Sequence, residues 1–495
     1  MTAPTFARPA ATAAACALVA AACTPVFFTG SRIDHVAMGG GDVRIVWNTA
    51  YDAAFPDPDH LLDTYEVRVD GTLVATHPRS TASCRLAGLA SATTYTVTIT
   101  AQTTSGEDSA TLPPSLGTLT EAITTPAGSD PGGPISCATE VDTDGDRLPD
   151  WVETDTGTFV DMTDTGTDPA VADTDEDGID DGDEVVGTSD GLALPLMGAD
   201  PLRRTIFVEI DWVDDSADCG THSHRPSAAA VDRVVQAFAD APVTNPDGTS
   251  GIDLVVDYGQ GASLMTSGTV ITDETAPIGS INGGVNGAEF AAIKAAHFHP
   301  AREGYFHYSL HIHRYNTSST SSGQAEVSGD DLIVSLQCFD GLTNTSNTLM
   351  HELGHNLGLR HGGDETTNHK PNYNSVMNYR FQFPGTDADT GTGACDAVGD
   401  QILGYSSGTR VALDESAVDE SAGVCGSVPI DFNTNSVIDP SPYSQNLNLD
   451  ALIETLGDVD DWAILDFGAV TDSDGAPLRT VAPVVEQPVP LAYQD

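Results

Sequence analysis

Three histidines and one glutamate lie close together in the C-terminal half of the chain, within the sequence HELGHNLGLRH. His351 and His355 are four residues apart, so on a helix they share one face about one turn apart and can bind one zinc ion at ~2.0–2.1 Å. Glu352 is rotated by one residue, so its carboxylate points beside the metal, where it can accept a proton from water. A straight helix would carry His361 away, and Gly358 allows the left-handed turn that brings it back as the third ligand. The spacing therefore predicts a zinc site with a general base beside it.

A methionine and a tyrosine follow in Ser375-Val376-Met377-Asn378-Tyr379. Together with HELGHNLGLRH, this segment resembles the zinc signature and the Met-containing turn of the metzincin metallopeptidases. The resemblance implies that Met377 forms a hydrophobic floor beneath the metal. It also implies that Tyr379 supports the oxyanion or acts as a switchable ligand, as in astacins and serralysins. The implied fold over residues 203–469 is an α/β catalytic domain with a mixed twisted sheet and an active-site helix.

The activity implied by this resemblance is zinc-dependent hydrolysis of peptide bonds in proteins, through zinc-activated water with Glu352 as general base. A predicted strand over residues 331–336 precedes the helix, and we expect it to pair with an extended peptide substrate. The alternative is a non-catalytic, calcium-dependent surface adhesion protein with a vestigial peptidase domain. The intact Glu352 argues against that alternative, since an inactive copy commonly loses this residue.

Acidic residues dominate residues 142–184, where 17 Asp and Glu accompany one base, Arg147. They repeat a spacing of positions 1, 3, 5, 9 and 12, which lets a tightly curled loop aim alternate carboxylates at a calcium ion. The first predicted loop contributes Asp142, Asp144, Asp146, Asp150 and Glu153, and the second contributes Asp173, Asp175, Asp177, Asp181 and Glu184. Gly178 occupies position 6 of the second loop, whereas Arg147 occupies it in the first, so we expect the first turn to be strained or differently wound. The run over residues 142–202 resembles thrombospondin type 3 calcium repeats, and a solvated acidic linker is the simpler alternative.

Two further clusters leave their interpretation open. His307, His311 and His313 share one face of a predicted strand, with His297 and His299 upstream. A packed, hydrogen-bonded face is favoured there over a second zinc site.

The other cluster contains Asp431, Asn433, Asn435 and Asp439, which match positions 1, 3, 5 and 9 of a calcium loop. Position 12 is Pro442 rather than an acid, so a third calcium site is the weaker interpretation.

Alternating apolar residues near the N-terminus predict an all-β domain over residues 25–120. Predicted strands cover residues 43–47, 64–69 and 94–100, and Asp70-Gly71 predicts a hairpin. Leu89 precedes Tyr95 by six residues, and with Trp47 and Tyr65 this pattern resembles a fibronectin type III sandwich. Residues 121–141 are predicted to form a linker.

The elements expected to position the zinc ligands follow residue 203. Predicted strands cover residues 205–213, 252–256, 305–312 and 332–336, with helices over residues 227–239 and 345–359. The tail over residues 470–495 is rich in proline and is predicted to be flexible.

The first 23 residues are typical of an export signal, with Arg8 before an uncharged run that ends Ala20-Ala21-Ala22-Cys23. The sequence leaves open whether Cys23 carries a lipid anchor or the chain is freely secreted. No later stretch is long and apolar enough to span a membrane. We therefore expect an extracellular or surface-anchored protein.

Six cysteines remain after the signal, and they allow 15 disulfide pairings. Cys395 with Cys425 is the favoured local pair, because only 29 residues (396–424) separate them.

A formal net charge of −54 excludes a phosphate-binding face for nucleic acid, which needs clustered Lys and Arg. The 17 acids and one base of residues 142–184 contribute −16 of this charge, so calcium loops account for a local part of it. The remaining −38 (−54 + 16) is spread over the rest of the chain.

Overall fold

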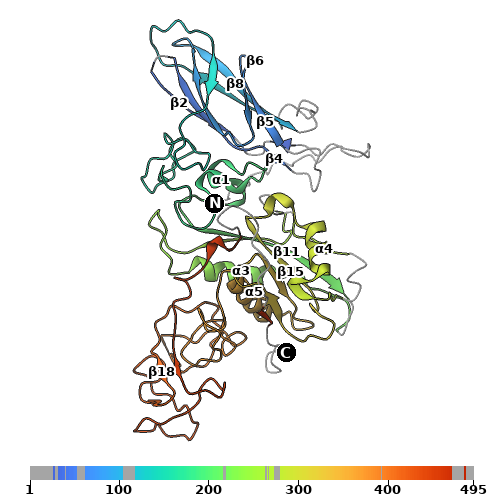
Figure 1. The fold of residues 1–495 in the computed structure, drawn as a ribbon, viewed down its shortest axis with the longest axis vertical. Coiled ribbons are helices and arrows are strands. Elements are labelled where there is room, and N and C mark those ends of the chain that lie inside the picture. The colour runs from blue at the N-terminus through green and yellow to red at the C-terminus, as the bar shows by residue number, and fades with distance from the viewer. Residues whose placement is uncertain are drawn as a thin grey trace, which may run out of the picture.

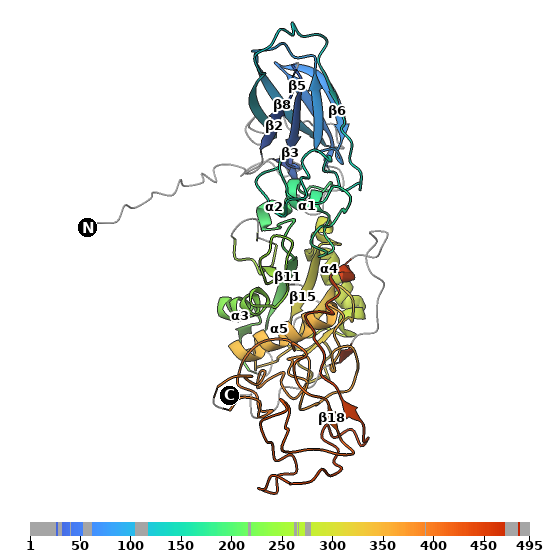
Figure 2. The same cartoon turned by 90° about the vertical axis from the view of Figure 1, so that its left-hand side faces the viewer.

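The computed structural model describes residues 26–27, 32–39, 41–52, 62–103, 117–215, 219–261, 265, 267–272, 279–391, 393–470 and 484–485. The predicted export signal with Cys23, and all of the predicted tail except residues 470 and 484–485, lie outside these residues. The molecule is mostly β-structure with few helices, and it is elongated (Figure 1). A β-sandwich forms one end, a mixed sheet with its helices forms the middle, and irregular loops form the other end (Figure 2).

The sandwich consists of two four-stranded antiparallel sheets that enclose one apolar core. The first sheet has the order β10 (Ser136–Ala138), β7 (Ser83–Ala87), β3 (Val43–Trp47) and β2 (Ile33–Ala37). The second has the order β6 (Thr72–Pro78), β5 (Leu62–Val69), β8 (Thr94–Thr103) and β9 (Thr118–Thr124). Two short strands, β1 (Val26–Phe27) and β4 (Tyr51–Asp52), pair beside them.

The residues that predicted the sandwich lie in its core or tie its corners. Trp47 and Tyr65 pack edge to face with ring centroids 5.9 Å apart. The Tyr95 hydroxyl oxygen accepts a hydrogen bond from the Ala90 backbone N–H at 2.8 Å. Asp70 and Gly71 both adopt positive φ, which permits the tight β5–β6 hairpin.

The predicted linker over residues 121–141 belongs largely to the sandwich. β9 continues to Thr124, and β10 pairs with β7. A disulfide joins Cys137 of β10 to Cys84 of β7, the neighbouring strand in the same sheet. The proline- and glycine-rich turn before β10 is the reason that this segment looks like a linker in the sequence.

The acidic segment packs between the sandwich and the mixed sheet, and its helices are short: α1 (Asp181–Val186) and α2 (Leu194–Met197). Leu148 and Val152 pack with Val46 of the sandwich. Ile179 packs instead with Phe207 and Phe306 of the mixed sheet. The two acidic loops therefore contribute apolar side chains to different neighbouring cores.

The mixed sheet is built around β11 (Thr205–Asp215). Its order is β12 (His222–Ser223), β11, β15 (Phe306–His311), β17 (Asp331–Val334), β16 (Gly323–Ala325) and β20 (Val484–Val485). β13 (Asp253–Asp257) and β14 (Val270–Ile271) also pair with β11. β13, β11, β15 and β17 are parallel, whereas β16 runs antiparallel to β17. The two residues of β20 pair with β16, so this part of the predicted tail is a strand.

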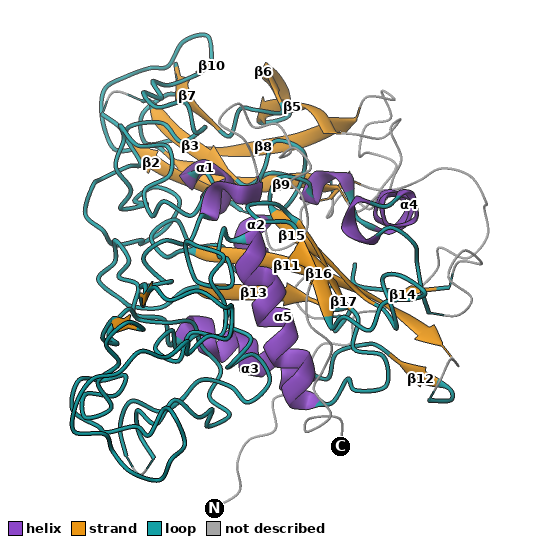
Figure 3. Cartoon of the chain, turned by 60° about the horizontal axis from the view of Figure 1, so that its bottom comes forward, coloured by secondary structure: helices purple, strands orange, loops and turns teal. Residues whose placement is uncertain are grey.

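Helices cover both faces of this sheet (Figure 3). α3 (Ala228–Ala239) and α5 (Leu342–Asn356) share one apolar core with the sheet, and α4 (Ala288–His297) packs into the other. The Ser227 side chain caps α3 by accepting a hydrogen bond from the Ala230 N–H, which explains where this helix begins. The predicted helix over residues 345–359 is observed three residues earlier at both ends.

The last part of the chain, from Leu357 to Val470, is irregular apart from β18 (Leu413–Asp414), β19 (Thr455–Leu456) and one short 3-10 helix (Phe467–Val470). Two further short 3-10 helices occupy Gly284–Asn286 and Pro300–Arg302. Disulfides join Cys219 to Cys338 and Cys395 to Cys425, and the second is the local pair favoured from the sequence. Among the described residues, no helix combines the length and the apolar composition needed to cross a lipid bilayer.

Candidate metal centre and acidic loops

The three predicted zinc ligands meet at the C-terminal part of α5. One potential ligand atom from each of His351, His355 and His361 lies within 4.8 Å of the others. The ring centroids are 4.9 Å apart for His351 and His355, 5.4 Å for His351 and His361, and 5.0 Å for His355 and His361. Three neutral imidazoles facing one point are a donor set that suits zinc and leaves further coordination positions open.

Backbone carbonyls fix the orientation of the two helical imidazoles. Nδ1 of His351 lies 2.6 Å from the Val376 carbonyl oxygen, and Nδ1 of His355 lies 2.7 Å from that of Leu359. An Nδ1–H that donates to a carbonyl leaves Nε2 as the metal-binding atom. Both rings are fully buried, so these contacts also prevent them from turning to solvent.

Gly358 ends the helix in the predicted way. Its φ is +88°, and its N–H donates a hydrogen bond to the His355 carbonyl oxygen at 2.9 Å. The Leu359 N–H donates to the Gly354 carbonyl oxygen at 2.8 Å. This left-handed exit redirects the chain so that His361 faces the helical pair.

Met377 lies directly against the helix. A side chain at Gly354 would place its Cβ 2.4 Å from the Met377 sulfur and 2.9 Å from the Tyr405 hydroxyl oxygen. Glycine is therefore required at this position for the methionine to approach. Met377 is fully buried, and the floor role expected for it stays a prediction.

Tyr379 lies beside the third histidine. Its ring centroid is 4.2 Å from that of His361 and 6.0 Å from that of His351. Its backbone N–H donates to the Asn368 side chain at 3.0 Å, which fixes this end of the turn. The structure thus brings Tyr379 next to the histidine cluster.

Glu352 is fully buried and faces β16, the strand next to β20 at the edge of the sheet. A Cβ on Gly323 would lie 2.0 Å from Glu352 Oε1, so only glycine allows the strand to approach this carboxylate.

The strand predicted to pair with a peptide substrate, β17, has β15 on one side and β16 on the other, so it has no free edge for a peptide. β16 takes that place, and its outer edge pairs with Val484 and Val485 of β20.

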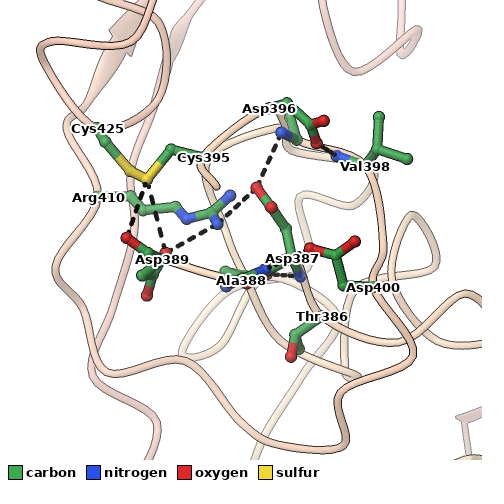
Figure 4. A network of polar contacts seen from close by, with 12 residues as sticks. Thr386, Asp387, Ala388, Asp389, Cys395, Asp396, Val398, Asp400, Arg410 and Cys425 are labelled. Carbon is green, nitrogen blue, oxygen red and sulfur yellow. Dashed lines mark hydrogen bonds and ion pairs between the residues drawn. A yellow bond between two sulfur atoms is a disulfide. The ribbon is translucent and has the colours of Figure 1, made fainter. Parts of the chain in front are cut away.

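An ion-pair network around Arg410 lies in the irregular segment that follows the Met377 turn (Figure 4). The Arg410 guanidinium donates to Asp387 at 2.8 Å and to Asp389 at 3.0 Å. The disulfide of Cys395 lies beside Asp389. Asp387 in turn exchanges backbone hydrogen bonds with the Asn374 side chain, immediately before the turn.

The two acidic loops form the same hydrogen bonds at equivalent positions. At position 1, Asp142 accepts from the N–H groups of Gly145 and Arg147, and Asp173 accepts from those of Glu176 and Gly178. The backbone N–H of position 7 donates to the carboxylate of position 5 in both loops, at 2.7 and 2.9 Å. Threonine at position 2 donates to the aspartate of position 9 in both. The sequence repeat is therefore also a repeat of backbone winding.

Arg147 adopts the same left-handed conformation as its counterpart Gly178, with φ of +85° and +89°. The first turn was expected to be strained or differently wound: its winding matches that of the second loop, and the strain of positive φ at a non-glycine residue is present. The Arg147 guanidinium forms an ion pair with Asp183 and donates to the carbonyl oxygens of Gly187 and Ser80. These contacts join the loop to the sandwich and offset the cost of positive φ at a residue with a side chain.

Several acidic oxygens in the loops are buried without a hydrogen-bond donor. They are both side-chain oxygens of Asp144 and of Glu184, Oε2 of Glu153 and Oδ2 of Asp175. Burial, then repulsion from neighbouring carboxylates, raises the pKa of Asp146 to about 9 and that of Glu153 to about 8, and raises those of Asp175 and Glu184. Such groups need either protons or a cation, and hard oxygen donors in this number suit calcium.

The two other predicted clusters differ from these loops. His307 and His311 are buried in β15, and burial lowers their pKa values to about 4 and about 3, so they are neutral packed side chains as favoured. His313 lies beyond the strand, and it contacts Asp215.

In the loop of Asp431, the acidic and amide oxygens accept hydrogen bonds from the loop itself, for example from Ser436 to Asp431 at 2.6 Å. Among the described side chains, none of these four residues has a buried oxygen without a donor. The third calcium site therefore lacks the feature that distinguishes the two acidic loops.

Three residues that the sequence patterns did not select, Asp215, His222 and His224, form a further group with His313. The sequence feature that could have indicated this group is the His-x-His spacing of His222 and His224, which puts both side chains on one side of a strand.

No protein-family model and no curated protein matches the chain. Among solved structures, the spore cortex lytic enzyme SleM of Clostridium perfringens is matched with 15% sequence identity and a TM-score of 0.15. The match covers 19% of this chain and 27% of that enzyme, so the aligned part is about a quarter of the enzyme's length. A likeness this low carries no argument about fold or function, and the site must be interpreted from its own chemistry.

Proposed function

We propose that the protein is an exported, zinc-dependent metalloendopeptidase of the metzincin type. The observation that carries the proposal is the convergence of His351, His355 and His361 to within 4.8 Å beside the buried Glu352. In this proposal the sandwich is a fibronectin type III-like module, and the acidic loops are thrombospondin type 3-like calcium sites between that module and the catalytic domain.

The residues have separate roles in the proposed reaction. His351, His355 and His361 would hold zinc, which when bound supplies a Lewis acid for the scissile carbonyl and lowers the pKa of water. Glu352, one position from His351 on α5, takes the proton of the attacking water and delivers it to the leaving amine. In the proposal Tyr379, whose ring lies beside that of His361, donates its hydroxyl to the developing oxyanion. Met377 supports the ligands from below.

Peptide main chain is the expected substrate, because β16 presents a strand edge next to Glu352. An extended peptide that adds to this edge would form main-chain hydrogen bonds and place one carbonyl near the histidines. Residues of the chain itself, Val484 and Val485, pair with that edge in the structure.

The direct test is cleavage of casein and of a mixed peptide library by the purified protein. We expect cleavage that a zinc chelator abolishes and added zinc restores, because the proposed ligands are neutral imidazoles that release metal to a chelator. Cleavage that persists in the chelator would contradict the proposal. Absence of cleavage in zinc-loaded protein would favour the adhesion protein.

A second expectation concerns β20. A chain that ends at residue 482 lacks Val484 and Val485, so the edge of β16 is open and we expect a lower KM for extended peptides. The comparison is with a full-length chain carrying Val489→Ala, which leaves both paired residues in place. Equal KM values for all three chains would show that β20 does not compete with substrate.

A further inference from the structure

A second group of metal-ligating side chains lies at the ends of β11 and β15. These strands are parallel, with Trp212 opposite His311. Asp215 and His313 follow these two residues along the chain, so both lie at the same end of the sheet. The hairpin of β12 brings His222 and His224 back to the same point, since β12 pairs with the end of β11. One potential ligand atom from each of the four residues lies within 4.8 Å of all the others.

The geometry of the group is close to that of a four-coordinate site. Zinc bonds of ~2.0–2.1 Å in a tetrahedron place ligand atoms ~3.3–3.4 Å apart. Asp215 oxygens lie 2.7 Å from His224 Nε2, 3.4 Å from His313 Nδ1 and 3.6 Å from His222 Nδ1. The imidazole centroids are 4.4, 5.9 and 5.6 Å apart, similar to the separations among His351, His355 and His361.

Neighbouring groups are placed to orient these ligands. His224 Nδ1, on the far side of its ring from Asp215, lies 3.5 Å from Asp340. His222 Nε2 lies 3.3 Å from the Gln337 carbonyl oxygen, and its Nδ1 lies 3.1 Å from the Gly220 carbonyl oxygen and 3.6 Å from Asp215. A carboxylate or carbonyl behind the imidazole, as at His224 and His222, is the usual outer shell of a metal-bound histidine.

The site is buried and covalently braced. Asp215, His224 and His313 have relative exposures of 6%, 4% and 0%. The Cys219–Cys338 disulfide joins the segment before His222 to the segment that holds Gln337 and Asp340. Three neutral imidazoles and one carboxylate leave a divalent ion with a charge of +1, which Asp340 offsets.

We propose that Asp215, His222, His224 and His313 bind a structural zinc ion, separate from the ion at His351. The four protein ligands fill a tetrahedron, so this site has no open position for a substrate and acts by fixing β12 and the start of α5 to the sheet. The proposal does not depend on peptidase activity.

The test is zinc content by elemental analysis, together with the absorption spectrum of the cobalt-substituted protein. His222→Gln, at a partly exposed ligand, is expected to hold one zinc ion fewer per chain than the wild type and to lose one set of cobalt bands. His351→Gln is expected to lose the other ion, and the double variant both. The control is His35→Gln in the sandwich, which should change nothing. Equal zinc content in wild type and His222→Gln would overturn the proposal and leave a hydrogen-bonded cluster.

Asp340→Asn provides a readout if the His222 variant does not fold. All four ligands remain, but the carboxylate behind His224 is lost, so zinc affinity at this site should fall roughly 10–100-fold. Competition with a chromophoric chelator measures this change, and an unchanged affinity would count against the assigned outer shell and the site with it.

Discussion

Glu352→Gln is expected to lower kcat/KM for peptide cleavage by roughly 10²–10⁴-fold while the zinc content stays at the wild-type value. The amide keeps the size of the side chain against Gly323, but it cannot take a proton from water. The loss corresponds to about 2.7–5.4 kcal/mol of transition-state stabilisation. Because backbone carbonyl oxygens of Val376 and Leu359 orient the imidazoles of His351 and His355, the histidine cluster should remain intact. Initial rates on a defined peptide, with elemental analysis of the same sample, measure both quantities.

The matched control is Glu303→Gln, an exposed glutamate in the same part of the chain. It should have wild-type rates. Equal activity in Glu352→Gln and the wild type would exclude Glu352 as the general base and with it the proposed mechanism. A rate loss that coincides with zinc loss would show that the substitution damages the ligand set instead.

The histidine cluster at His351 is predictable from sequence because its parts are local. Two ligands and the base are fixed by the 3.6-residue period of one helix. The third depends on a single left-handed residue, Gly358, three positions before it. Helical geometry and one turn therefore determine the arrangement, and tertiary packing only adds the Met377 floor and the orienting carbonyls.

The Asp215 group is not predictable in the same way. Asp215 and His313 are 98 residues apart (313 − 215), and they meet only because β11 and β15 pair in one particular parallel register. A single sequence does not specify that register, so His313 was grouped with His307 and His311 by strand parity alone.

The spatial order of strands explains why the predicted peptide-docking strand was wrong. β16 precedes β17 in the chain but lies outside it in the sheet, so the edge was assigned to the wrong strand.

The acidic loops could be predicted from the sequence only in part. Their spacing and their winding are local, and the repeat predicted both except at Arg147. The turn there was expected to be strained or differently wound, and it has the same winding with the strain of positive φ. The compensation comes from Asp183 and from Ser80 of the sandwich, and these contacts are not encoded within the loop itself. The loops also contribute to two separate cores, through Leu148 and Ile179, which a spacing pattern does not reveal.

Removing calcium is expected to lower the melting temperature of the protein by roughly 5–11 °C. A ligand at 100 times its Kd stabilises the folded state by about 2.7 kcal/mol, and each kcal/mol shifts Tm by about 2–4 °C for a domain of 150–250 residues. The physical cause is the buried acidic oxygens of residues such as Asp144 and Glu184, which have no hydrogen-bond donor and repel one another without a cation. Calorimetry in calcium and in a calcium-selective chelator measures the shift.

Glu184→Gln separates specific binding from a general effect of charge. The carboxylate at position 12 supplies two buried oxygens to the second loop, so its amide should lose a large part of the calcium-dependent shift. Asp155→Asn removes the same unit of negative charge from an exposed position between the loops and should keep the full shift. If both variants respond to calcium like the wild type, the ion does not bind where Glu184 lies. If wild-type Tm is the same in calcium and chelator, the segment is an acidic spacer whose buried carboxylates hold protons, and the calcium proposal fails.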